Sequence, residues 1–127
     1  MAGIFVTGTD TGIGKTVLSC SMAAYLSLKQ GYDVGVMKPV ESGIETKDQR
    51  LASDAFALKE ASGSTDDIDL INPYIFKAPL APQMAATLEN VTIDIARLTR
   101  IYQQLTSRHD VMVIEGAGGV LVPILDG

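Results

Sequence analysis

The sequence has 127 residues, of which 46% are hydrophobic and 20% charged, a balance that excludes general disorder and suits one folded domain over residues 1–127. Fifteen acidic residues against ten lysines and arginines give a net charge of −5, which disfavours nonspecific binding to nucleic acid or anionic membranes. The single cysteine, Cys20, excludes an internal disulfide, and we expect it to be a small core residue on a helix. With no basic leader and no apolar run near the roughly 20 residues of a membrane span, we expect a cytoplasmic protein.

The first part of the chain is predicted to form a strand, a helix and a second strand. Gly3–Thr7 and Val34–Met37 are short apolar runs typical of buried strands. Between them, Lys15–Gln30 carries apolar residues at helical spacing, and Gly31 is its expected stop. The residues expected on the apolar face of this helix are Val17, Leu18, Met22, Tyr25, Leu26 and Leu28. A strand, helix and strand in this order indicate a parallel unit, and the polar residues 39–50 after it predict a surface loop.

The second part of the chain is predicted to contain three more helices and a third buried strand. In chain order we expect a helix over Leu51–Ala61, an extended segment over Asn72–Pro79, a helix over Pro82–Leu88, a helix capped by Thr92 and running through Leu105, and a strand over Val111–Ile114. A parallel sheet of three strands leaves apolar faces and an edge uncovered, so we expect a carboxyl-terminal part to be missing.

The strongest motif is the glycine-rich segment Gly8–Thr16, which follows the first strand and opens the first helix. Its backbone N–H groups and the helix amino end attract phosphate, and the glycines, Gly12 and Gly14 among them, let the backbone approach a ligand closely. Lys15 suits the β- and γ-phosphates, and the Thr16 hydroxyl suits Mg²⁺. The first glycine lies one position earlier than in the P-loop pattern. A glycine-rich turn without a ligand is the alternative.

Charged residues follow the other two predicted strands. Lys38 comes directly after the second strand, and Glu115 follows the third and opens a second glycine-rich turn. Because the carboxyl ends of parallel strands meet at one edge of a sheet, we expect these residues near the phosphate loop. Glu115 would hold Mg²⁺ directly or through water. Taken alone, Lys38 could be a solvated edge charge and Glu115 a capping carboxylate.

Three other polar residues have ordinary explanations when each is taken alone. Asp54 suits the first turn of a helix, Ser42 suits a turn, and His109 suits a solvated position at a helix end. One histidine and one cysteine cannot form a zinc site of the usual pattern or a Ser-His-Asp triad.

Five ordered segments of the chain resemble dethiobiotin synthetase: Phe5–Thr11 with Gly14–Thr16, Lys38–Gly43, Ser53–Ala55, Asn72–Tyr74 and Val113–Gly119. The resemblance implies an α/β P-loop fold of three layers with a mostly parallel sheet, and the early first glycine also fits that family. It implies an enzyme that joins 7,8-diaminononanoate, CO₂ (or bicarbonate) and ATP into a cyclic urea, with release of ADP and phosphate. A carbamate forms first, ATP phosphorylates it, and the second amine closes the ring.

The resemblance also implies roles for particular residues. Lys38 is similar to the family's active-site lysine, Lys15 would follow the γ-phosphate, and Thr11 and Ser42 would contact the substrate or carbamate. The implied magnesium shell is Thr16, Asp54 and Glu115. The implied nucleotide contacts are Gly12, Ile13, Gly14, Lys15, Thr16, Val17, Asp54, Glu115, Gly116, Ala117 and Gly118. On this basis we expect Lys38→Ala to fold but to lose turnover, with Lys38 on the rim of the crevice and outside the core.

The resemblance has limits, and two other function classes share the phosphate loop. Gly12 stands where some relatives carry an acidic residue, and relatives are longer, with later segments that contribute adenine contacts and a homodimer interface. Amidotransferase-type synthetases that activate a corrinoid carboxylate use a further domain with a catalytic cysteine, a role that Cys20 inside the first helix cannot fill. Partition or septum-site ATPases bind DNA or membrane as dimers and carry an extra lysine where this chain has Asp10.

Overall fold

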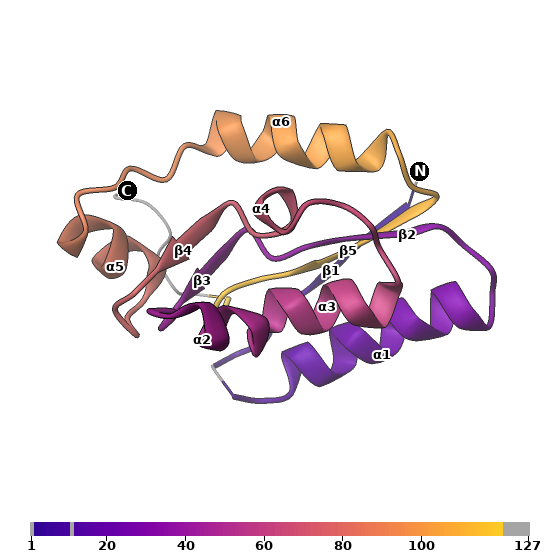
Figure 1. Cartoon of the computed structure of the whole chain (residues 1–127), viewed down its shortest axis with the longest axis horizontal. Helices are drawn as coiled ribbons and strands as arrows, with labels where there is room; N and C mark the ends of the chain where they lie inside the picture. The colour runs from indigo at the N-terminus through magenta and orange to yellow at the C-terminus, as the bar shows by residue number, and fades with distance from the viewer. Residues whose placement is uncertain (1, 11, 121–127) are drawn as a thin grey trace.

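The computed structural model describes residues 2–10 and 12–120 (Figure 1). Its elements are β1 (Ala2–Val6), α1 (Lys15–Leu28), β2 (Val34–Met37), β3 (Val40–Ser42), α2 (Lys47–Leu51), α3 (Asp54–Ser62), α4 (Ile68–Ile71), β4 (Tyr74–Phe76), α5 (Pro82–Leu88), α6 (Ile95–Thr106) and β5 (Val111–Glu115). The three apolar runs predicted as strands are strands, and the helices expected after the phosphate loop and at Pro82 are present. Thr11 lies outside the described residues.

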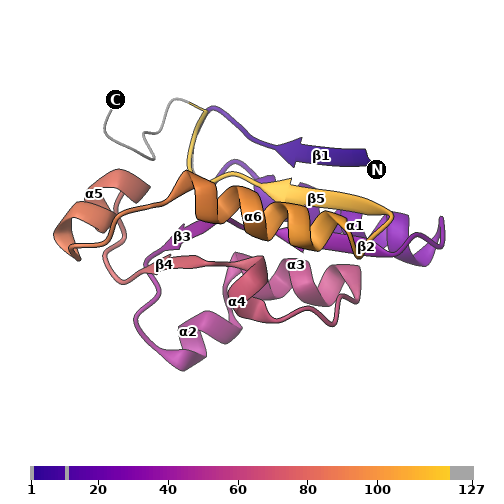
Figure 2. The same ribbon diagram turned by 90° about the horizontal axis from the view of Figure 1, so that it is seen from above.

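The main sheet consists of three parallel strands in the order β1-β5-β2 (Figure 2). β5, the last strand among the described residues, therefore lies between β1 and β2. Val34 pairs with Val111 and Val36 pairs with Val113, while Val6 pairs with Glu115. Because all three strands run in the same direction, the segments that leave their carboxyl ends meet at one edge of the sheet.

Helices cover both faces of this sheet, which gives three layers. Figure 1 shows α1 and α3 on one face and α6 on the other. Side chains alternate between the faces, so Val111 and Val113 of β5 join the core on the α1 side, whereas Met112 and Ile114 pack toward α6. The predicted α/β P-loop fold with a parallel sheet is confirmed. Over the described ranges, none of the helices has the length and apolar composition needed to cross a membrane.

The prediction of a surface loop over residues 39–50 is wrong, because this segment holds β3 and α2. β3 pairs in parallel with β4, with Val40 opposite Tyr74. The pairing partner lies more than thirty residues away, so local polarity gave no sign of it. α2 is a short helix with a capping box, in which the Thr46 side chain accepts from Gln49 N–H and the Gln49 side chain accepts from Thr46 N–H.

Helix details also differ from the expectations. The cap of α6 is Asp94 and not Thr92, since the Asp94 carboxylate accepts the N–H of Ala96 at 2.8 Å. The short helix α4 was not expected at all. In α1 the buried side chains are Lys15, Ser19 and Ala23, and four residues predicted on its apolar face are exposed: Val17, Leu18, Tyr25 and Leu28. Small side chains at the contact allow α1 to lie close to the sheet and α3.

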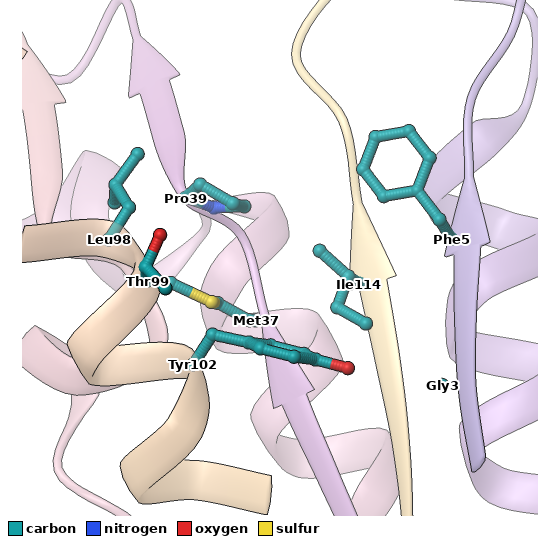
Figure 3. A pocket seen from close by; sticks show the side chains of 8 residues that line it. All are labelled: Gly3, Phe5, Met37, Pro39, Leu98, Thr99, Tyr102 and Ile114. Atoms are coloured by element: carbon teal, nitrogen blue, oxygen red, sulfur yellow. The ribbon is translucent and has the colours of Figure 1, made fainter. Parts of the chain in front are cut away.

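A largely apolar cavity of about 350 Å³ lies between α6 and the sheet (Figure 3). Phe5 and Ile114 from the strands and Tyr102 from α6 border it. A Cβ atom at Gly3 would come within 2.8 Å of the Tyr102 hydroxyl, so glycine allows the ring to lie there. The residues that line this cavity carry no charged side chain, and it opens on the sheet face away from the core of α1 and α3.

Candidate active site

The phosphate loop links the end of β1 to the first turn of α1. Gly14 is the N-cap of α1 and has a φ of 96°, a conformation that suits glycine. The amino end of the helix, whose first N–H groups have no partner within the helix itself, therefore adjoins the loop. Lys15 is buried, and its Nζ donates to the Asp10 carbonyl at 2.8 Å. The predicted role of Thr11 falls on a residue outside the described ranges.

The second glycine-rich turn packs directly against the phosphate loop. Val120 N–H donates to the Gly8 carbonyl at 2.7 Å. A Cβ atom at Gly119 would lie 2.5 Å from the Thr9 carbonyl oxygen, so the close approach requires glycine there. The turn that follows β5 thus closes one side of the loop that follows β1.

Strand register brings Lys38 and Glu115 together. Alternate residues of a strand lie on the same face of a sheet. One face therefore carries Val34, Val36 and Lys38 together with Val111, Val113 and Glu115. Since Val36 lies beside Val113, two further steps along each strand place Lys38 beside Glu115. The Lys38 ammonium donates to Glu115 Oε1 at 2.9 Å.

The ammonium of Lys38 has two further acceptors. Asp54 Oδ2 and the Gly116 carbonyl each lie 3.3 Å from Lys38 Nζ. Asp54 is the first residue of α3, where its charge complements the helix amino end. Thr16 Oγ1 donates to Glu115 Oε1 at 2.7 Å. Four segments, which are α1, α3 and the ends of β2 and β5, thus converge on one group of polar atoms.

The expected position of Lys38, on the crevice rim and outside the core, is wrong. Lys38 is 4% exposed and Glu115 is 1% exposed. A lysine can be buried here because two carboxylates and a carbonyl accept hydrogen bonds from its ammonium. The convergence of Lys38, Glu115 and the phosphate loop that was predicted from the strand ends is confirmed.

A cavity of about 380 Å³ lies between the phosphate loop and this polar group. Its lining contains Lys38, the predicted active-site lysine, and most of the residues predicted to contact nucleotide or metal: Gly12, Gly14, Lys15, Thr16, Val17, Asp54, Glu115 and Gly118. Ile13 is not among them, and its side chain is exposed. Gly116 takes part through its carbonyl.

Ser42 and Ala117 line a neighbouring cavity of about 360 Å³. This second cavity shares Lys38 and Asp54 with the first and continues along Pro79 and Leu80. The Ser42 hydroxyl donates to the Leu80 carbonyl at 2.8 Å, so in this structure it does not face the phosphate loop.

The oxygen atoms at the first cavity suit a hard divalent cation. Glu115 Oε2 is buried and, in the part of the chain that the structure describes, has no hydrogen-bond partner. The Thr16 hydroxyl and the half-exposed Asp54 carboxylate border the same cavity. Among the described residues, no three His, Cys, Asp or Glu side chains form a metal cluster. Two carboxylates and a hydroxyl fit Mg²⁺, which takes its remaining ligands from water and phosphate.

Glu41 supports this site and was not predicted to do so. Its carboxylate accepts the N–H of Asp54 at 2.8 Å and the N–H of Ala55 at 3.3 Å, so it holds the amino end of α3. Burial raises the pKa of Glu41, and the hydrogen bond from Asp54 N–H partly opposes that rise. No local pattern could show this role, since it depends on β3 lying against α3.

Cys20 lies behind the site and is unsuited to nucleophilic chemistry. It packs against the core on the α1 side, as predicted. Burial raises the pKa of its thiol, and the negative charges of Glu115 and Asp54 raise it further. A thiol with a raised pKa holds little of the reactive thiolate.

The prediction of a solvated His109 is also wrong. Its side chain is 8% exposed, with Nδ1 2.7 Å from Asp33 Oδ1 and Nε2 2.6 Å from Asp66 Oδ2. Burial lowers the pKa of His109, but the hydrogen bonds to the two carboxylates outweigh burial, and the net pKa is raised. This cluster precedes β5, at the end of the sheet opposite the cavity, and belongs to the scaffold.

A sequence family described as AAA domain matches residues 2–127. Curated relatives named ATP-dependent dethiobiotin synthetase BioD are 45% identical over 124 residues in Anaeromyxobacter sp. (strain K), 44% over 124 in Bacillus licheniformis and 43% over 125 in Methanocaldococcus jannaschii. The alignments cover 98%, 98% and 95% of this chain, and 54%, 52% and 55% of the relatives. The chain thus spans about half the length of these relatives, and the predicted resemblance is confirmed.

Proposed function

The chain belongs to the AAA domain family, and on that premise we propose that it carries the nucleotide-binding and phosphoryl-transfer part of an ATP-dependent dethiobiotin synthetase, a carbon–nitrogen ligase. The observation that carries the proposal is the buried Lys38 ammonium, which faces the cavity of the phosphate loop and is held by Glu115 and Asp54. The fixed cation lies where an anionic acceptor would meet the end of a triphosphate.

The proposed reaction transfers negative charge between a carbamate and a phosphoryl group at a single site. One amine of 7,8-diaminononanoate takes up CO₂ to form a carbamate, and a carbamate oxygen attacks the γ-phosphorus of ATP, so that ADP leaves. The second amine then attacks the carbamate carbon, phosphate leaves, and the urea ring closes. The carbamate, the transferring phosphoryl group and the departing phosphate all carry negative charge, so fixed positive charge stabilises the transition states that lead to and from them.

Four residues are assigned parts in this reaction, and two of them, Lys38 and Lys15, line the cavity. Lys38 would steady the carbamate and the moving phosphoryl group, and one such preorganised contact is worth about 3 to 4 kcal/mol of barrier. The Lys15 ammonium, which donates a hydrogen bond to the Asp10 carbonyl in this structure, would contact the γ-phosphate instead. The main-chain amides at the start of α1 would hold the phosphate oxygens. Ser42, in the neighbouring cavity, and Thr11 would contact the carbamate or the diamine.

Magnesium fits the donors at this site. Thr16, Asp54 and Glu115 would hold it, with Glu115 Oε2 supplying a buried oxygen that no described hydrogen-bond donor occupies. Bound magnesium neutralises charge on the phosphate oxygens. The remaining contacts to the nucleotide would come from Gly12, Gly14, Val17 and Gly118. Main-chain atoms would be contributed by Ile13, Gly116 and Ala117.

The proposal includes the setting in which the protein acts. We propose one domain over residues 1–127, a homodimer, a cytoplasmic location and small-molecule partners, with no nucleic acid and no membrane. The net charge of −5 supports the last point, since both surfaces are anionic.

Phosphate release from ATP by the complete purified protein tests the function. We expect release that requires both bicarbonate and 7,8-diaminononanoate, with dethiobiotin identified by mass spectrometry. Omission of each substrate in turn is the control. Release that needs neither substrate, or that rises with DNA or anionic vesicles, would contradict a synthetase and favour a switch ATPase.

A further inference from the structure

The main chain of Lys38 is held by two residues at the end of α4. Its N–H donates to the Ile71 carbonyl at 2.8 Å, and its carbonyl accepts from Asn72 Nδ2 at 2.7 Å. Pro39 follows and has no N–H to donate. The point from which the Lys38 side chain begins is therefore fixed by the segment at the end of α4.

The side-chain amide of Asn72 suits this contact. It is 2% exposed, and its amide nitrogen also donates to the Tyr74 carbonyl at 3.3 Å. Both neighbours of that nitrogen are carbonyl oxygens, which only accept, so the amide must present its two N–H groups to them. An aspartate would place a carboxylate against two carbonyls, and an alanine would leave both without this donor.

We propose that Asn72 is a positioning residue for Lys38: by clamping the Lys38 and Tyr74 carbonyls, it sets the place from which the ammonium reaches Glu115, Asp54 and the phosphate loop. This inference rests on the proposed function, in which Lys38 carries the chemistry. A displacement near 1 Å at such a group changes rates by as much as about a hundredfold.

The topology separates this role from nucleotide binding. The phosphate loop follows β1, and Asn72 contacts the segment that follows β2, with β5 lying between these two strands. A change at Asn72 should therefore alter Lys38 while it leaves the phosphate loop intact. A residue that only supports the fold would affect both together.

Acetylation of lysines by acetic anhydride tests the positioning, with rates read by mass spectrometry against the exposed Lys29. The variants are Asn72→Ser and Asn72→Ala, and the matched control is Ile71→Val, which loosens the same segment but keeps the amide. At a temperature where circular dichroism shows all of them folded, we expect the Lys38 rate to rise about tenfold in the Asn72 variants and to stay within about twofold in the control. Equal rates in Asn72→Ala and Ile71→Val would overturn the proposal.

Steady-state kinetics give the second readout. In the Asn72 variants we expect kcat for phosphate release to fall about tenfold or more, with KM for ATP within about twofold of the wild type. If both parameters shift as they do in Ile71→Val, the role is structural and the proposal fails. If the wild type releases no substrate-dependent phosphate, the proposed function fails, and the acetylation rates still decide the role of Asn72.

A measurement on the wild type covers the case in which the Asn72 variants do not fold. Side-chain amide protons can be followed by nuclear magnetic resonance as they exchange with water. We expect the Asn72 amide protons to exchange far more slowly than those of the exposed Gln104. Equally fast exchange would show that the clamp does not exist in solution.

Discussion

Lys38 Nζ lies 2.9 Å from Glu115 Oε1, although 77 positions separate the two residues in the sequence. The pair follows from parallel strand register, because Val36 lies beside Val113 and alternate residues share a face. Both side chains are nearly inaccessible to solvent. The pair is therefore part of the core and of the candidate site at once, and a change at either residue should affect stability as well as turnover.

Lys38→Met should reduce turnover and stability together. The variant leaves the Glu115 carboxylate buried without its cation, a change that costs about 3 to 5 kcal/mol of unfolding free energy. Turnover of the folded variant should fall about a hundredfold or more, because the fixed charge is gone. Chemical denaturation and the phosphate-release assay measure the two effects.

The double variant Lys38→Met/Glu115→Gln separates these effects. It removes both charges, so much of the stability should return while turnover stays low. Wild-type turnover in either variant would remove Lys38 from the proposed mechanism.

Glu115→Gln should weaken the effect of magnesium on nucleotide binding. The wild-type carboxylate has one buried oxygen, Oε2, without a described partner, while Oε1 accepts from the Thr16 hydroxyl, and the amide is a poor ligand for a hard cation. Calorimetry with ATP, with and without MgCl₂, gives the ratio of affinities. We expect that ratio to fall about tenfold, while Glu60→Gln, an equal charge change at an exposed site, leaves it unchanged. An unaltered ratio in Glu115→Gln would exclude Glu115 from the metal site.

Stability should depend on pH through His109, the single histidine of the sequence. Its pKa is raised in the folded state: burial opposes the imidazolium, but the hydrogen bonds to Asp33 and Asp66 outweigh it. The stabilising contribution of His109 is thus complete at pH values below its ordinary pKa of about 6.5. It is lost as the pH rises through the higher pKa of the folded state. The pKa of Asp66 is lowered, since hydrogen bonds from His109 and Ser64 outweigh its burial, so its contribution is complete above the ordinary carboxyl pKa and is lost as the pH falls through the lower folded pKa.

Denaturation of His109→Gln at two pH values measures this contribution. We expect a loss on the order of 1 to 2 kcal/mol at pH 6 and a smaller loss at pH 9. Arg100→Gln, which breaks an exposed ion pair with Asp94, serves as the control and should show little effect at either pH. An equal loss of unfolding free energy for His109→Gln at pH 6 and pH 9 would mean that the charge of His109 does not contribute to stability.

Asp94→Ala should destabilise α6 by about 1 kcal/mol, because the carboxylate accepts the N–H of Ala96 at the first turn. Thr92→Ala is the matched control and should be nearly neutral, since Thr92 is exposed and lies two residues before the cap. Thermal unfolding of both variants gives the comparison. The reverse order of effects would restore Thr92 as the cap.

Local patterns were sufficient for the features that depend on near neighbours in the chain. Short apolar runs gave β1, β2 and β5, and the glycine-rich segment with Lys15 and Thr16 gave the phosphate loop. The meeting of Lys38 with Glu115 could also be predicted, because it needs only parallel strands that end at one edge.

Features that depend on distant partners could not be predicted in this way. β3 exists because residues 40–42 pair with residues 74–76, and residues 40–42 contain Glu41 and Ser42 and so form no apolar run of their own. Lys38 is buried because acceptors arrive from α3 and β5, and His109 is buried because carboxylates arrive from positions 33 and 66. Periodicity within a short window contains no information about such pairings.

A crystal structure with bound magnesium and a nonhydrolysable ATP analogue tests the central claim most directly. The account predicts phosphates against the main-chain amides at residues 12–16, with the terminal phosphate facing the Lys38 ammonium and the metal beside Thr16 and Glu115. Phosphates bound elsewhere, or a Lys38 side chain directed away from them, would contradict it.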